Sequence, residues 1–498
     1  MCKDYDYDYD YDYDLIIRNV DVYDGTGSDS FKSDLGITGD RITKLDIIAS
    51  NASATETINA EGFAIAPGFI DVHSHDDWLV FSEPTMDGKI MQGVTTVVNG
   101  NCGWGVHPQN AARTPPDDTP IPVWHSYEDY FKVLAERPPA VNVAMLAGFG
   151  PLRAGAIGSA TEKRPASDAE IEQMCAWMRE AMEAGCVGMS TGLVYEPDRY
   201  ASFEEILAVA RELEPFDGLY ASHVRDEGET LLEAHAEAIE IGQRAGIRVQ
   251  ISHHKAQGQQ WWGKVKDSLV QIERAQAAGV DVTADQYPYI ASSTRLAAMK
   301  QNGQFDPGIE IPKILLAAVP GHSEWEGQSI EALALEWDLP IDQTVNRVLD
   351  QAGDAVFAVR FAINEEDVRT VLKHSSTMIG SDGLGYGSKP HPRHFGTFPR
   401  VLGHYARDEE ILSMENAIHK MTGIPASKFQ LNERGIIREG AFADLVIFDP
   451  LTIIDRATYE NPRQSPEGIP WVIVNGSIVV RDSVHTGSLP GQGIRRGQ

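Results

Sequence analysis

The feature that most constrains the fold is a set of short strand-like runs, each followed by a stretch with helical character. Eight such runs occur, at residues 68–72, 94–98, 142–147, 188–192, 218–222, 248–252, 280–284 and 377–381. Strands that alternate with helices form parallel βα units, and eight such units close into a barrel. The chain has 498 residues, well above the roughly 250 that such a barrel needs. We therefore predict an α/β fold, a (β/α)8 TIM-like barrel.

Both ends of the chain have a different pattern, in which short β-rich segments are separated by Gly and Asp turns. Such segments lie at residues 15–20, 34–38, 443–448 and 471–476. They predict one small β-sandwich domain built from both termini, with its first part at residues 15–66 and its second at 431–490. The barrel then spans residues 67–430. Within it, the stretch from about 295 to 350 is too long for one βα loop, so we expect an inserted subdomain there.

The first residues have an unusual composition, because Asp and Tyr alternate strictly from residue 4 to residue 14. Alternation is typical of strands, but charges of one sign at this density repel one another. We expect residues 1–14 to form a disordered Asp/Tyr tail.

The overall composition restricts the partners of the chain. Its formal net charge of −31 repels phosphate backbones and anionic lipid heads, so we expect neither nucleic acid nor a membrane as partner. The four cysteines are too scattered for a disulfide framework, and no apolar run reaches the roughly 18 residues of a membrane span. The start of the chain also lacks a secretory signal pattern. These features fit a soluble, cytoplasmic enzyme, and they leave the substrate and the oligomeric state open.

Side chains that bind metals follow the first two runs. The first run ends in His73-Ser-His75, and strand residues two apart point to the same face, so both imidazoles can hold one ion. Cys102 lies in a Gly-rich loop after the second run, and a thiolate is a good zinc ligand at roughly 2.3 Å. By contrast, Cys175 and Cys186 lie in and just after a helical stretch, which indicates a packing role. Because strand ends share the catalytic face of a barrel, these residues predict a metal centre.

Later runs add further candidates. His223 follows the fifth run, and the sixth ends in His253 and His254. Neighbouring strand residues face opposite ways, so at most one of that pair faces the barrel centre. Asp382 ends the eighth run. A carboxylate there can bind metal, take a proton from water and pass it to a leaving amine.

These residues lie in segments that resemble a known family. Residues 66–75, APGFIDVHSH, resemble the first-strand signature of the amidohydrolase superfamily. Further segments resemble the D-aminoacylases, or N-acyl-D-amino-acid deacylases, and the match extends from about residue 15 to about 490. The segments are GVTTVV (93–98), STGLVY (190–195), SHVRDE (222–227), ISHHK (251–255), QYPY (286–289), GSDG (380–383), PHPRHFGTFPR (390–400), GAFADLV (440–446) and EGI (467–469). The segment at 390–400 is the most specific, because other amidohydrolases are not expected to carry it.

The resemblance implies a metal centre with two positions. The implied ligands of one tight zinc are Cys102, His223 and His253, and those of a second, weaker site are His73, His75 and Asp382. The family pattern thereby aligns its ligand with His253 rather than His254. Many relatives bridge two metals with a carboxylated lysine, and in this subgroup the cysteine takes that place.

The resemblance also implies substrate anchors, at Tyr195, Lys255, Tyr287 and Arg393. Two cations and two phenol donors suit a carboxylate. One position departs from the family pattern, since Phe149 stands where a histidine is expected. If that histidine contributes to catalysis in relatives, the activity of this chain is altered.

The implied reaction is zinc-dependent hydrolysis of the amide bond of N-acyl-D-amino acids, giving a carboxylate and a free D-amino acid. Arg295 and Lys300, in the predicted insertion, are the cations whose direction decides which substrate side chain is preferred. If either faces the site, acidic side chains gain a partner. Long cations in an insertion are more often solvated than buried, so we expect a preference for apolar side chains.

Two alternatives remain at this stage. A cyclic-amide hydrolase of the hydantoinase or dihydroorotase type would want a carboxylated lysine near the fourth strand, where residues 190–192, Ser-Thr-Gly, offer none. A metal-depleted, non-catalytic scaffold would have lost ligands, whereas all six candidates are present.

Overall fold

The centre of the structure is a parallel barrel. The computed structural model describes residues 12–112, 121–301, 304–305 and 308–497. Eight strands lie side by side in the order β18-β12-β11-β10-β9-β8-β7-β6, and a parallel bridge between Ser74 and Gly383 joins the two ends. Each strand falls on one of the eight runs, which confirms the predicted barrel. The strands are β6 (Phe69–Asp71), β7 (Val94–Asn99), β8 (Asn142–Gly148), β9 (Gly188–Gly192), β10 (Leu219–His223), β11 (Arg248–Ile251), β12 (Val282–Gln286) and β18 (Thr377–Ile379).

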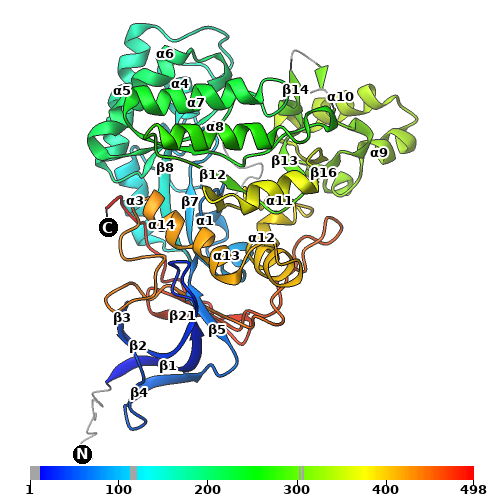
Figure 1. Ribbon diagram of the computed structural model, residues 1–498. Helices are drawn as coiled ribbons and strands as arrows, with labels where there is room; N and C mark the ends of the chain where they lie inside the picture. Colours follow the sequence, from blue (N-terminus) through cyan, green and yellow to red (C-terminus); the bar gives the residue numbers. More distant parts are fainter. Residues whose placement is uncertain (1–11, 113–120, 302–303, 306–307, 498) are drawn as a thin grey trace, which may run out of the picture.

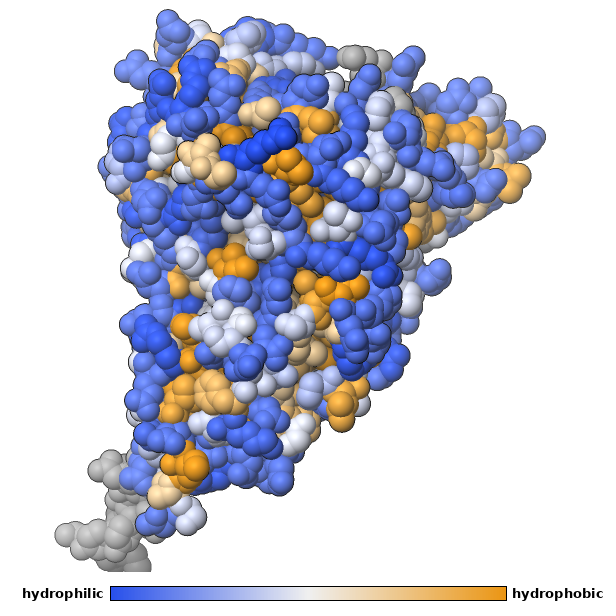
Figure 2. Space-filling model, in the orientation of Figure 1, coloured by the Kyte–Doolittle hydropathy of each residue, from blue (hydrophilic) through white to orange (hydrophobic). Residues whose placement is uncertain are grey.

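Helices cover the outside of this barrel (Figure 1). Their amphipathic pattern explains the packing, since α7 buries one face, which includes Leu231, Ala238 and Ile241, and leaves charged residues such as Glu240 and Arg244 outside. Figure 2 shows a largely hydrophilic face with small, separate apolar patches. No described helix is long and apolar enough to cross a membrane. The helices are α1 (Leu79–Ser82), α2 (Asp87–Ile90), α3 (Tyr127–Glu136), α4 (Phe149–Ile157), α5 (Asp168–Glu183), α6 (Phe203–Ala210), α7 (Leu231–Ala245), α8 (Val265–Ala277), α11 (Glu365–Lys373), α12 (Arg393–Arg400), the π-helix η8 (Val401–Asp408), α13 (Met414–Met421) and α14 (Gly423–Lys428).

A second sheet combines strands from both ends of the chain and encloses an apolar core of its own. Its two halves meet where β5 pairs antiparallel with β19, with Ile65 opposite Ile447. The strands are β1 (Tyr13–Val22), β2 (Phe31–Thr38), β3 (Arg41–Leu45), β4 (Ala54–Asn59), β5 (Ala64–Pro67), β19 (Leu445–Phe448), β20 (Trp471–Val474), β21 (Ser477–Arg481) and β22 (Val484–His485).

The start of β1 corrects the predicted tail at its inner end. Tyr13 and Asp14 belong to the sheet, because the Tyr13 ring lies against Gly36 and the Asp14 carboxylate accepts the Gly39 N–H at 2.6 Å. Residues 1–11 of that tail lie outside the described residues.

The insertion forms a compact unit between β12 and α11. Its central sheet pairs the distant segments β13 (Ala291–Arg295) and β17 (Phe357–Phe361) antiparallel, so the inserted elements extend beyond residues 295–350 on both sides. Apolar residues from its helices and strands make a separate core. The other elements are β14 (Lys300–Gln301), β15 (Gln304–Phe305), β16 (Leu315–Ala318), α9 (Ile330–Trp337) and α10 (Ile341–Ala352).

A fully buried ion network joins the first and last strands of the barrel. The Lys89 ammonium lies 2.7 Å from Asp71 Oδ2 and 3.4 Å from Asp76 Oδ2, and it donates to Ser381 Oγ at 2.7 Å. Asp71 in turn accepts the backbone N–H groups of His73 and Ser381 at 3.2 and 2.8 Å. One lysine therefore balances the carboxylate that holds both strand ends in register.

We predict that Lys89→Met lowers the free energy of unfolding by about 3–5 kcal/mol, because it leaves buried carboxylates without their cation. Denaturant titration measures this loss. Lys132→Met is the matched control, since Lys132 pairs with Asp129 at 3.4 Å but its side chain is 61% exposed, and surface pairs contribute little. A loss for Lys89→Met no larger than that for Lys132→Met would refute the role of the network.

Candidate metal centre and active site

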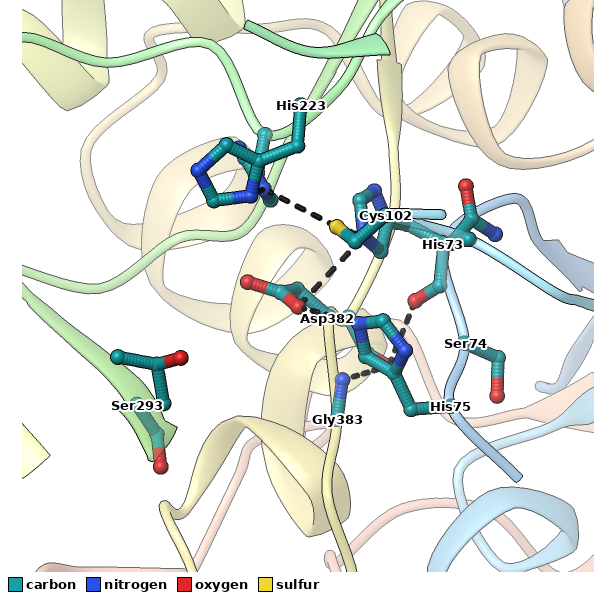
Figure 3. Close-up of polar contacts among 12 residues, drawn as sticks. His73, Ser74, His75, Cys102, His223, Ser293, Asp382 and Gly383 are labelled. Carbon is teal, nitrogen blue, oxygen red and sulfur yellow. Dashed lines mark hydrogen bonds and ion pairs between the residues drawn. The ribbon is translucent and has the colours of Figure 1, made fainter. Parts of the chain in front are cut away.

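Six side chains of metal-ligand type meet at the C-terminal ends of the barrel strands (Figure 3). They form two overlapping groups, and the ligand atoms within each group lie within 4.8 Å of one another. One group is Cys102, His223 and His253, and the other is His73, His75, Cys102 and Asp382. Cys102 belongs to both groups, so the structure has the donors for two adjacent metal positions that share one sulfur.

The distances within the cluster are short enough for common ligation. Cys102 Sγ lies 3.4 Å from His253 Nε2 and 3.2 Å from His73 Nε2. The facing nitrogens of His253 and His223 are 2.8 Å apart. On the other side, His75 Nε2 lies 3.1 Å from Asp382 Oδ1.

Backbone conformation aims three of these side chains. Cys102, His253 and Asp382 have φ values of 53°, 36° and 49°, in the left-handed region that non-glycine residues seldom adopt. Each lies just beyond the end of its strand, where the turn directs the side chain toward the barrel axis. Strained backbone conformations persist only where the surrounding structure holds them in place, and they are found most often at functional sites.

The protonation state of Cys102 suits a metal ligand. Burial alone would raise the pKa of its thiol, but the positive charges of His73 and His253 outweigh that effect and hold the pKa well below its ordinary value. By contrast, burial raises the pKa of Cys175 to about 11 and raises that of Cys186 further. Cys102 is therefore the cysteine poised to be a thiolate, the form that binds metals.

The two adjacent histidines face opposite sides of the strand. His253 points to the cluster, whereas His254 Nε2 lies 2.7 Å from Ser268 Oγ on α8, and its ring lies 4.8 Å from that of His235. His235 lies on α7 and is only 1% exposed. It packs between helix and barrel, a position that a single histidine in a helical stretch does not reveal.

Sequence reasoning missed two carboxylates that orient the histidines. A carboxylate only accepts hydrogen bonds, so His73 Nδ1 donates to Asp285 at 3.0 Å. His253 Nδ1 lies 3.0 Å from Glu227 Oε1 and 2.9 Å from the Lys255 ammonium. His223 Nε2 also faces Glu227, at 3.8 Å. Such partners fix the ring tautomer and leave the other nitrogen free to bind metal. Only their positions in the sequence could have pointed to these carboxylates, since Asp285 lies in the barrel strand β12 and Glu227 ends the segment SHVRDE.

The four predicted anchors lie around the same cluster. The Arg393 guanidinium lies 2.9 Å from Asp382 and 4.4 Å from the centre of the Tyr287 ring. Lys255 Nζ lies 5.6 Å from the centre of that ring. Tyr195 lies across the site, with its ring 5.0 Å from that of His223. The structure thus brings all four predicted anchors beside the candidate ligands.

A cavity of about 430 Å³ opens next to His223 and Tyr195. The buried Glu227 and Arg360 line it, and Trp261 forms part of its wall. The cluster is therefore next to a space that can admit a small molecule.

The two insertion cations differ in placement. Arg295 is half-buried, with its guanidinium carbon 5.6 Å from the centre of the Trp104 ring and 5.8 Å from that of Phe357. The Trp104 ring in turn lies 4.9 Å from that of His75. Lys300 instead donates to Asn346 at 3.0 Å in an exposed contact. Our expectation that both cations face solvent was wrong for Arg295, because the pairing of β13 with β17 sets it opposite Phe357.

Phe149, the departure from the family pattern, begins α4 and is fully buried in the main core. Its ring packs with apolar side chains of that core.

Comparison with known proteins agrees with this architecture. The amidohydrolase family model matches residues 56–311 and 316–480. The D-aminoacylase of Alcaligenes xylosoxydans xylosoxydans is 40% identical over 97% of both chains. A D-aminoacylase structure with a binuclear metal center, described by one-metal activation and second-metal attenuation, superposes with a TM-score of 0.90 at 40% identity, over 97% of this chain and 100% of that one. N-acyl-D-glutamate deacylase from Bordetella bronchiseptica, complexed with zinc and a phosphonate inhibitor, gives a TM-score of 0.89 at 35% identity, over 97% and 99% of the two chains.

The barrel, its strand-end ligands and the family match define the class, and the chain belongs to the amidohydrolase family. Within that family it belongs with the D-aminoacylases and N-acyl-D-amino-acid deacylases, to which it is similar over nearly its whole length.

Proposed function

We propose that the chain is a zinc-dependent N-acyl-D-amino-acid deacylase, which hydrolyses the amide bond to give a carboxylate and a free D-amino acid. The observation that carries this proposal is the pair of ligand groups sharing Cys102, with cationic anchors on one side. Because Cys102 serves as a ligand only while reduced, we place the reaction in a reducing compartment, the cytoplasm.

The donor set fits zinc. Cys102, His223 and His253 would hold one tightly bound ion, since thiolate and imidazole are the donors zinc prefers and three protein ligands leave a position open. His73, His75 and Asp382 would complete a second, weaker position.

Zinc, when bound, polarises a carbonyl and lowers the pKa of water toward about 7. Asp382 moves the proton. Burial would raise its pKa, but the charges of Arg393 and His73 hold that pKa well below the ordinary range. The carboxylate is therefore ready to accept a proton from the attacking water, which it returns to the leaving amine nitrogen.

The anchors fix the other end of the substrate. Arg393 and Lys255 supply positive charge for the substrate carboxylate, and the Tyr287 hydroxyl is a buried donor with no hydrogen-bond partner among the described residues. With the carboxylate and the scissile amide both held, only one enantiomer directs its side chain into the remaining space, and the family relationship favours the D form.

Arg295 selects the side chain. Its placement between Phe357 and Trp104, whose ring lies against that of the candidate ligand His75, gives an acidic side chain a cationic partner in a partly dry environment. We therefore propose D-glutamate or D-aspartate derivatives as preferred substrates, in place of the apolar ones expected from the sequence.

The two alternatives fit the site less well. A cyclic-amide hydrolase would carry a carboxylated lysine at the end of β9, where this chain has Ser190 and Thr191. A non-catalytic scaffold gives no reason for six buried ligand-type residues to remain together.

The metal assignment predicts that Cys102→Ala loses most of the zinc of the purified protein, measured by elemental analysis. Cys186→Ala is the control and should keep it, because that thiol is buried in the core away from the cluster. Full zinc in Cys102→Ala would remove Cys102 from the ligand set.

The proton-transfer role predicts that Asp382→Asn lowers kcat at least about a hundredfold, the usual size of a general acid–base effect. The tight zinc should remain bound. Asp338→Asn, an exposed change in the inserted subdomain, should leave kcat unaltered. Near-normal turnover in Asp382→Asn would show that another group moves the proton.

The decisive test compares kcat/KM for N-acetyl-D-Glu, N-acetyl-D-Leu and their L forms. We expect N-acetyl-D-Glu to be favoured by about tenfold to a hundredfold, the scale of one charge-assisted hydrogen bond. Arg295→Ala should abolish this preference, and Lys300→Ala should retain it. Preference for an L form would overturn the deacylase assignment, whereas preference for D-Leu would overturn only the acidic specificity.

A further inference from the structure

One connection of the small domain leaves its sheet and reaches the barrel. It joins β19 to β20 and lies at residues 449–470, beside α12 (Figure 1). Arg463 Nη2 donates to the carbonyls of Gly385 and Gly387 at 2.7 and 2.9 Å, and Lys389 Nζ donates to the Glu460 carbonyl at 2.7 Å. The connection is therefore fixed to the barrel segment between Asp382 and Arg393.

Tyr459 is the residue of this connection that faces the anchors. Its ring lies 4.8 Å from that of Phe361, at the end of β17, and 5.1 Å from that of His391. His391 lies 6.4 Å from Tyr287, whose ring lies under the Arg393 guanidinium. Three rings thus form a continuous row from the small domain to the carboxylate anchor.

The hydroxyl of Tyr459 is buried and has no hydrogen-bond partner among the described residues. The Tyr287 hydroxyl and Arg393 Nε, at the other end of the row, are also buried without a hydrogen-bond partner among the described residues. An unsatisfied buried polar group costs about 1–3 kcal/mol, so several in one place call for a ligand that accepts their hydrogen bonds. Burial raises the pKa of Tyr459, so its hydroxyl remains a donor at neutral pH.

The ligand that fits three donors, one of them cationic, is a carboxylate, because it offers about four acceptor sites and a negative charge. We propose that Tyr459 is a substrate-binding residue supplied by the small domain, whose hydroxyl donates a hydrogen bond to the carboxylate of the bound amino-acid moiety beside Arg393 and Tyr287. The nature of that substrate rests on the proposed function.

Tyr459→Phe tests this proposal in the full-length, zinc-loaded protein. The change keeps the ring against Phe361 and His391 and removes only the hydroxyl, so a purely packing role would be preserved. We expect KM for N-acetyl-D-Glu to rise about tenfold with kcat changed less than twofold, the signature of lost uniform binding. Calorimetry should show a similar loss of affinity for D-glutamate. Tyr23→Phe is the matched control, because the Tyr23 ring packs near Phe448, at 6.2 Å, and it should change neither quantity.

A second variant, Arg463→Leu, removes the two hydrogen bonds that fix the connection, and it should raise KM in the same direction. Unchanged KM and D-glutamate affinity in Tyr459→Phe would overturn the proposal, as would a wild-type protein that binds no D-glutamate. If the wild type binds D-glutamate through Tyr459 but cleaves no N-acyl-D-amino acid, the proposed function fails and the binding role stands.

Discussion

The active-site geometry depends on the buried junction between the first and last strands of the barrel. Asp71 accepts hydrogen bonds from the backbone of both strands, and Lys89 neutralises it out of contact with water. This junction fixes His73 relative to Asp382, whose N–H donates to the His73 carbonyl at 2.7 Å. A barrel that closed one residue out of register would turn these side chains to opposite faces.

The cluster above this junction concentrates charge in a protein of strongly negative net charge. Glu227 and Asp285 lie next to histidines whose other nitrogens face Cys102 or one another, and Asp382 lies 3.1 Å from Nε2 of His75. Each carboxylate is balanced by a neighbouring cation or N–H donor, so the local charge is set by contacts and not by the overall composition. A strongly negative chain can therefore still place buried cations such as Arg393 beside its cluster of ligand-type residues.

Most of the framework could be predicted from sequence, because it rests on local patterns. The eight strands were recognisable as short apolar runs, and the ligands follow them directly. Arg295 could not be placed, because its direction depends on pairing β13 with a strand more than sixty residues later. Lys89, Glu227 and Asp285 were missed for a related reason. An isolated charged residue is normally solvated, and only the closed barrel shows that each of these has a buried partner.

The small sheet, assembled from both ends of the chain, has a consequence for synthesis on the ribosome. One edge of β5 pairs with β1, and its other edge pairs with β19. At the usual rate of about five to twenty residues per second, β19 emerges roughly 20–75 s after β5. During that time a strand edge with apolar residues is exposed, which favours pairing with other chains. The yield of folded protein should therefore depend on elongation rate and on chaperones that shield this edge.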